Sequence, residues 1–199
     1  MSVRIYVEGG GDNKDTIRRC KEGFASYCHK LAPPNRHPSI VACGGRQQAF
    51  DRFRAALLDS REDEICVLLV DAEDRVSAGA PVEHLRARDG WIFPAFDRHK
   101  VFLMAQAMEA WFLADRETLA AFYDGGFLEK SLPGSASNVE SIPKGDLEPG
   151  LKHASKPTKT KGEYHKVKHG FALLALISPA KVGAASPHAM QFHNFLREL

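Results

Sequence analysis

The sequence has no long apolar run and no sign of a segment that would direct it out of the cell. No uninterrupted apolar stretch approaches the roughly 20 residues that are needed to cross a bilayer. Residues 1–4 lead directly into a strand-like run and not into a signal peptide. We therefore expect a cytoplasmic protein that does not insert into a membrane.

Several common site motifs are also missing. The four cysteines are scattered without C-x-x-C spacing, which argues against a zinc site and a disulfide framework. The glycine run after residue 8 lacks the G-x-G-x-x-G spacing of dinucleotide sites. His165 and His169 are four residues apart, but no H-E-x-x-H motif joins them, so a zinc protease is not indicated.

What remains is the composition of a folded globule. Hydrophobic residues make up 44% of the chain and charged residues 26%. A chain of 199 residues can bury one full core but is too short for two large independent domains. The formal net charge is only +2, so the overall charge points to no particular partner.

Apolar runs alternate with helical periodicity over residues 1–124. The predicted strands are 3–7, 39–43, 65–70 and 100–104, and the predicted helices are about 13–29, 47–58, 82–88, 106–113 and 116–123. Residues 65–70 are continuously apolar, as is typical of a central parallel strand covered on both faces. The alternation predicts an α/β fold with a mainly parallel central sheet and helices on both faces.

The second half of the chain differs in composition. Residues 125–161 are rich in Gly, Pro, Ser and Lys and poor in large apolar residues, which predicts a long, partly mobile segment. Helical periodicity returns at 164–177 and at about 187–199. We therefore divide the chain into an α/β core (1–124), a variable basic segment (125–163) and a C-terminal helical extension packed on the core (164–199).

Acidic residues follow the predicted strands. The carboxyl ends of parallel strands meet at one edge of an open sheet, which is where such sheets bind ligands. Carboxylates brought together there repel one another unless a cation lies between them, and Mg²⁺ or Mn²⁺ prefers oxygen ligands. The sequence thus predicts one or two divalent ions. The candidate ligands are Glu8, Asp12, Asp71, Glu73, Asp74 and Glu109.

These acids differ in how well a structural role would explain them. The glycines after Glu8 suit a tight βα turn, with Asp12 as a helix cap. Glu109 lies in an otherwise apolar helix and either reaches the site or points to solvent. Acids directly after a buried strand are harder to explain by solvation alone. If the strand continues, Asp71 and Glu73 share one side, so that Asp74 is peripheral or binds a second ion.

A basic cluster occupies residues 152–168. This stretch contains six lysines and a single acid, Glu163, with Tyr164 and several histidines among them. Such a cluster can neutralise several phosphates, and the aromatic groups suit RNA bases. The alternative is a solvated loop. The lysines are Lys152, Lys156, Lys159, Lys161, Lys166 and Lys168.

Taken together, the acidic motifs resemble the Toprim fold, the catalytic domain of topoisomerases, primases and nucleases of the overcoming-lysogenization-defect (OLD) type. Val7-Glu8-Gly9 matches the Glu at the end of that family's first strand. Asp71-Ala72-Glu73 takes the place of its D-x-D motif as D-x-E, which leaves open whether Glu73 or Asp74 is the second ligand. Residues 109–115 and the tail 164–188 look like signatures of a bacterial Toprim-like family of unknown function. Its members are often paired with an ABC-type or AAA-type ATPase in anti-phage defence.

The resemblance implies a Mg²⁺-dependent phosphodiesterase, a nuclease that acts on RNA or DNA, with residues 1–124 as its Toprim-like catalytic core. Glu8, Asp71 and Glu73 would be catalytic residues that hold the metal, with Glu109 as a second-metal ligand or a neighbouring group. The lysine cluster would bind the nucleic-acid backbone. Two other functions stay open: a non-catalytic partner or sensor subunit of an ATPase complex, and a phosphohydrolase or phosphotransferase that acts on small nucleotides.

Overall fold

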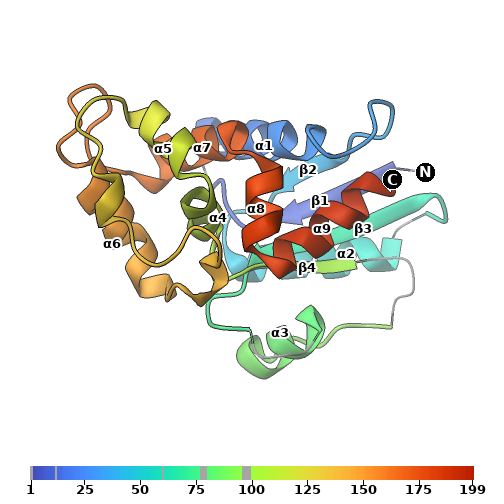
Figure 1. The fold of residues 1–199 in the computed structure, drawn as a ribbon. Helices are drawn as coiled ribbons and strands as arrows, with labels where there is room; N and C mark the ends of the chain where they lie inside the picture. Colours follow the sequence, from blue (N-terminus) through green and yellow to red (C-terminus); the bar gives the residue numbers. More distant parts are fainter. Residues whose placement is uncertain (1, 12, 60, 77–79, 96–99) are drawn as a thin grey trace.

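A four-stranded parallel sheet forms the centre of the protein (Figure 1). The computed structural model describes residues 2–11, 13–59, 61–76, 80–95 and 100–199. The strand order is β2-β1-β3-β4. The strands are β1 (Ser2–Val7), β2 (Ser39–Ala42), β3 (Glu64–Asp71) and β4 (Lys100–Met104). Each lies within one residue of its predicted bounds, so the α/β class and the parallel sheet are confirmed.

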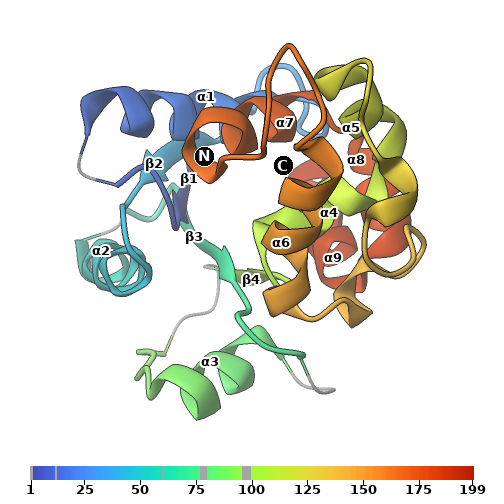
Figure 2. The same ribbon diagram turned by 90° about the vertical axis from the view of Figure 1, so that its left-hand side faces the viewer.

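Helices cover both faces of the sheet. Successive residues of β3 point to opposite faces, so this strand contributes to two separate cores. Val67 and Leu69 belong to the larger core, on the side of α1 (Lys14–His29). Leu68 and Val70 belong to a second core. That core is closed by α2 (Arg46–Asp59) and α3 (Pro81–Asp89), which lie on the other face (Figure 2). Burial on both faces explains why this strand is apolar throughout.

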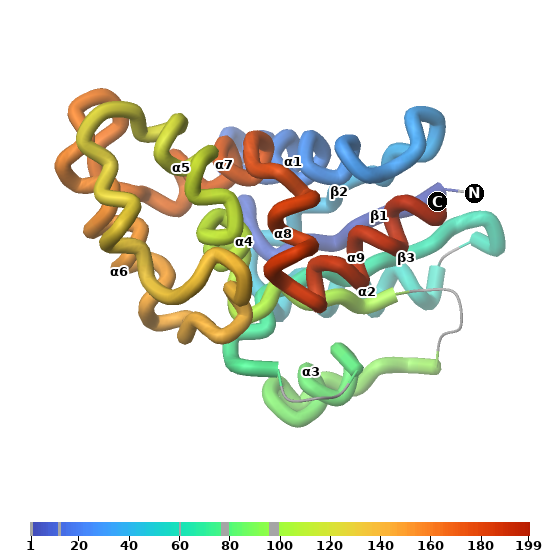
Figure 3. The backbone as a smooth tube through the Cα atoms, viewed as in Figure 1, coloured from blue at the N-terminus to red at the C-terminus, as the bar shows by residue number. Residues whose placement is uncertain are grey.

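The remaining helices lie beyond the carboxyl ends of the strands or return along the α1 face. Figure 3 shows the chain leaving the sheet after β4 and returning through α8 and α9. Phe102 of β4 contacts Phe192 and Phe195 of α9 at 5.4 Å between ring centroids, which fixes the C-terminal extension on the sheet. The elements are α4 (Met108–Ala114), α5 (Arg116–Tyr123), α6 (Lys144–Ser155), α7 (Phe171–Leu176), α8 (Pro179–Ala185) and α9 (Pro187–Arg197).

Residues 125–163 contain structure that composition did not predict. Two 3₁₀ turns, Glu129–Ser131 and Val139–Ser141, precede helix α6. Leu147, Leu151 and Ala154 of α6 are fully buried in the larger core. They lie three or four residues apart on one helical face, while Gly, Pro and Lys occupy most of the remaining positions. The boundaries of the three segments stay a prediction.

The helix predicted over 164–177 is wrong in its first turns. His165 is extended, and a π-helical turn, Lys166–Gly170, precedes α7. The backbone N–H of Tyr164 donates to Ser155 Oγ at 2.6 Å, which ties this residue to α6. Helix α8 was also not predicted. Among the described residues, no helix is both long and apolar enough to span a bilayer.

Candidate metal centre

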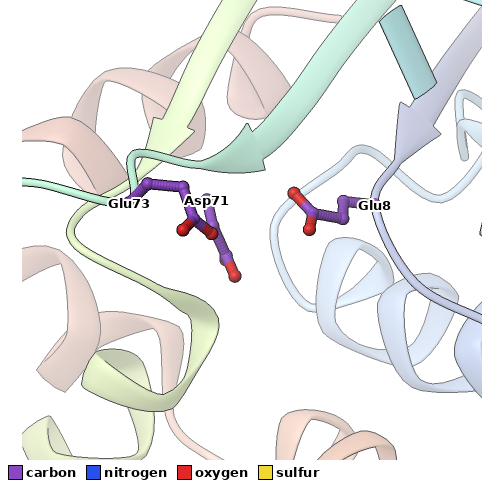
Figure 4. A group of neighbouring side chains, drawn as sticks. All are labelled: Glu8, Asp71 and Glu73. Carbon is purple, nitrogen blue, oxygen red and sulfur yellow. The ribbon is translucent and has the colours of Figure 1, made fainter. Parts of the chain in front are cut away.

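The carboxyl ends of β1 and β3 are neighbours, and the chain leaves them in opposite directions, to β2 and to β4. Open α/β sheets bind ligands at such a switch point. Glu8 directly follows β1, Asp71 ends β3, and Glu73 comes two residues later. Figure 4 shows the Glu8 carboxylate pointing toward the other two. One oxygen atom from each of the three residues lies within 4.8 Å of the others.

These donors fit a hard divalent ion. All three are carboxylate oxygens, the ligands that Mg²⁺ and Mn²⁺ prefer. Oxygens at the usual Mg²⁺ distance of about 2.1 Å lie at most about 4.2 Å apart. Small side-chain rotations would therefore bring Glu8, Asp71 and Glu73 around one ion.

The backbone next to Glu8 depends on glycine. Gly9 and Gly44 exchange two backbone hydrogen bonds, at 2.7 and 2.8 Å, which tie the ends of β1 and β2 together. Gly10 has φ 92°, and a Cβ atom there would lie 3.2 Å from both Ala42 and Ile17. Only glycine fits this turn without displacing β2 or α1, so the turn sets where Glu8 leaves the strand.

Asp71 is the most buried member of the group, with 3% of its surface exposed. Its Oδ1 accepts a hydrogen bond from the backbone N–H of Met108 at 2.8 Å, at the start of α4. Its Oδ2 lies 3.9 Å from Lys166 Nζ. Burial raises the pKa of Asp71 to about 7, and Glu109 and Glu8 add to this shift, while Lys166 opposes it. A carboxylate in such a place favours a nearby cation.

Glu8 is held by a cation that sequence analysis did not identify. Arg46 Nη1 lies 3.5 Å from Glu8 Oε2 and also donates to the backbone carbonyl of Asp71. Asp89 anchors the same guanidinium with two hydrogen bonds of 3.0 and 2.8 Å. Burial raises the pKa of Glu8 and Glu73 adds to the shift, while Arg46 opposes it. Arg46 thus joins the ends of β1 and β3.

Glu73 has the uncommon backbone conformation of φ 72°. Its N–H donates to the backbone carbonyl of Gln106 at 2.8 Å, which fixes the loop after β3. Its carboxylate is hydrogen-bonded by Lys144 Nζ and lies 3.6 Å from Arg88. The side chain of Gln106 accepts a hydrogen bond from the backbone N–H of Lys144 at 3.0 Å. Gln106 therefore binds the backbone of both Glu73 and Lys144, whose side chains pair with each other.

Asp74 lies outside the group. Its side chain is 69% exposed and pairs with Arg88 at 2.8 Å. The structure therefore brings Glu73, and not Asp74, to Glu8 and Asp71. Asp12, the remaining predicted ligand after β1, lies outside the described residues.

Glu109 is buried, with 3% of its surface exposed, so the solvent-facing interpretation is wrong. The Tyr164 hydroxyl donates to Glu109 Oε1 at 3.1 Å, and Lys166 Nζ lies 3.2 Å from the same oxygen. Burial alone would lower the pKa of Lys166, but Glu109 and Asp71 raise it well above its usual value. Glu109 is therefore linked to Asp71, one of the three carboxylates, through the ammonium group of Lys166.

The predicted lysines differ in their surroundings. Lys166 lies between Asp71 and Glu109, as described above. Lys152 pairs with Glu148 on α6 at 2.8 Å. Lys161 lies over the Phe122 ring, 4.4 Å from its centroid. Lys161 is exposed, and so are Lys156, Lys159 and Lys168.

Comparison with known proteins gives one match. A protein family described as Domain of unknown function (DUF4276) matches residues 7–197. That range includes every residue of the candidate metal centre. A search of curated proteins and a search of solved structures each returned no match. Because the match covers nearly the whole sequence, the chain belongs to the DUF4276 family.

Proposed function

We propose that this protein is a metal-dependent phosphodiesterase, a nuclease of Toprim type that uses Mg²⁺ or Mn²⁺. The observation that carries the proposal is the convergence of Glu8, Asp71 and Glu73 at the carboxyl ends of β1 and β3. The Toprim resemblance of the sequence assigns metal-binding carboxylates to the same three positions. A parallel α/β sheet is the scaffold that this assignment requires.

An ion held by these carboxylates would supply the chemistry of phosphate-ester hydrolysis, by activating water and by stabilising charge on the phosphate. The protein's own groups orient the ligands. The Met108 N–H holds Asp71, and Arg46 holds Glu8. Lys166 places a positive charge beside the same carboxylates, where it can contact a phosphate oxygen.

We assign Glu109 the role of a positioning residue in this mechanism. Its contacts with Tyr164 and Lys166 support that role, because they hold the Lys166 ammonium next to Asp71. We assign the exposed lysines 156, 159, 161 and 168 to the nucleic-acid backbone. Our further proposal of an effector in bacterial anti-phage defence, with an ABC-type or AAA-type ATPase as partner, rests on the sequence resemblance alone.

The test is cleavage of labelled tRNA, single-stranded DNA, duplex DNA and mononucleotides, with and without Mg²⁺ or Mn²⁺. Glu8→Gln should abolish metal-dependent cleavage, since it removes a ligand charge with little change of size. Asp51→Asn, a change of an exposed acid on α2, is the matched control and should cleave as the wild type does. Cleavage that persists in Glu8→Gln, or in the presence of EDTA, would refute the metal mechanism. Turnover of mononucleotides alone would favour the small-nucleotide alternative.

A further inference from the structure

A cavity of about 270 Å³ opens directly beside the candidate metal centre. Three charged residues of the site, Glu8, Asp71 and Lys166, form part of its lining. Another part of the lining is apolar and consists of the side chains of Met104, Met108, Val167 and Phe171. Backbone of the Gly-rich turn, together with Thr16 and Gly44, completes the wall. One cavity thus combines a charged part with an apolar part.

The two parts select different groups of one ligand. The carboxylates, with the ion they are proposed to hold, and Lys166 suit a phosphate. Thioethers and an aromatic ring suit a flat, polarisable ring system. A Cβ atom on Gly9 would lie 3.3 Å from the Phe171 ring, so this ring borders the Gly-rich turn.

The glycine backbone adds polar groups to the apolar part. Thr16 Oγ1 donates to the carbonyls of Gly10 and Asn13, which orients this residue in the wall. Between described residues, no hydrogen bond uses the N–H of Gly10 or Gly11. Acceptor atoms on the edge of a ring can therefore bind there. A nucleotide carries both groups: a phosphate and a flat ring with acceptor atoms on its edge.

The size of the cavity limits what can enter. Its volume of about 270 Å³ lies at the lower end of small-molecule sites, which start near about 300 Å³. A base that is paired and stacked inside a duplex cannot reach such a cavity unless it leaves the stack. An unpaired base needs no such step.

We propose that this cavity binds the base of one unpaired nucleotide whose phosphate lies at the three carboxylates. The inference rests on the proposed function and narrows its substrate to single-stranded nucleic acid or free nucleotide. Both sources share one chemistry, an unpaired nucleoside phosphate.

The first experiment uses the wild-type protein in Mg²⁺ and measures equilibrium binding of AMP, ribose 5-phosphate and inorganic phosphate by calorimetry. AMP should bind about tenfold tighter than ribose 5-phosphate, since contact with one base is typically worth that much. Equal affinities would overturn the inference, because the base would then contribute nothing.

The second experiment narrows the cavity. Val167 is 39% exposed, so Val167→Trp can place a larger side chain at the opening without disturbing the core. It should weaken AMP binding about tenfold and leave ribose 5-phosphate unchanged. Leu176→Trp is the matched control, because Leu176 is 55% exposed and lies outside the lining. AMP binding by Val167→Trp at wild-type strength, with an unchanged thermal melt, would also refute the inference.

The third experiment separates the two sources and the two proposals. If a single-stranded octamer displaces AMP and its blunt duplex does not, the ligand is an end or a loop of a polymer. If no octamer displaces AMP, the ligand is the free nucleotide. Equal displacement by duplex and single strand would contradict the inference. Cleavage is measured on the same samples. Tighter binding of AMP than of ribose 5-phosphate without any cleavage refutes the proposed nuclease activity alone. Metal-dependent cleavage with equal affinities for AMP and ribose 5-phosphate refutes the proposed base-binding cavity alone.

Discussion

Replacing Asp71 by Asn should stabilise the metal-free protein at neutral and alkaline pH. Asp71 is almost fully buried and carries a charge there only at a cost. Asparagine keeps nearly the same shape, and its side-chain oxygen can still accept the hydrogen bond from the Met108 N–H. Lys166 loses one partner but keeps Glu109 at 3.2 Å. The substitution therefore removes the buried charge and little else.

The magnitude follows from the pKa of Asp71, about 7 in the folded protein, against an ordinary value of about 3.9. Between these two values the folded state binds more protons than the unfolded state. Stability of the wild type therefore falls as pH rises through this window, by up to about 1.4 kcal/mol per pH unit. The full loss is on the order of 4 kcal/mol. Asparagine does not titrate, so the variant escapes this loss.

Thermal denaturation in EDTA from pH 4 to pH 8 measures the difference. The two proteins should melt together near pH 4, and the variant should melt higher by on the order of 10 °C at pH 8. Added Mg²⁺ should then raise the melting temperature of the wild type and not that of Asp71→Asn, because only the wild type keeps the ligand. A variant less stable than wild type at pH 8 in EDTA, or a difference that does not depend on pH, would refute the reasoning.

Three further predictions concern the neighbouring groups. Glu109→Gln should lower kcat more than it raises KM, because the Lys166 ammonium is then held less firmly and stabilises the charge of the transition state less well. A change of KM alone would contradict this prediction. Glu73→Gln should weaken Mg²⁺ binding in calorimetry and Asp74→Asn should not, because only Glu73 lies with the other two carboxylates; the reverse order would assign the ligand to Asp74. Removing three exposed lysines should weaken binding of all nucleic-acid sequences about equally and flatten the salt dependence by roughly one slope unit per lost phosphate contact, and an unaltered slope would indicate a solvated loop. The lysines to replace by Ala are Lys156, Lys159 and Lys161.

Local pattern was enough to predict the sheet and two of the three carboxylate positions. The strands are short apolar runs, and β3 is continuously apolar because both of its faces are buried. Parallel strands place their carboxyl ends at one edge, so acids directly after β1 and β3 had to lie near one another. Glu8 and Asp71 were therefore predictable from sequence alone. Glu73 was favoured over Asp74 on the assumption that the strand continues, but β3 ends at Asp71. The position of Glu73 depends instead on its positive φ and on its contact with Gln106.

Helix α6 shows where composition fails. Gly, Pro and Lys in residues 144–155 predict a loop, but tertiary packing of one apolar face outweighs these weak propensities. The residues before α7 also depart from the helix that local periodicity predicts: Tyr164 is hydrogen-bonded to Ser155 of α6, and His165 is extended before the π-helical turn.

The positive charges around the carboxylates were decided only by the tertiary structure. They come from α2, α3, α6 and the π-helical turn, and no local pattern relates these segments: the residues are Arg46, Arg88, Lys144 and Lys166. Burial of Glu109 likewise depends on Tyr164, which lies 55 residues further along the chain. The sequence alone thus determined that Glu8 and Asp71 stand at the ends of strands, because an apolar run and the residue that ends it form a local pattern. Folding decided their neighbours, their burial and their pKa values, because desolvation and charge pairing depend on residues that are distant in sequence.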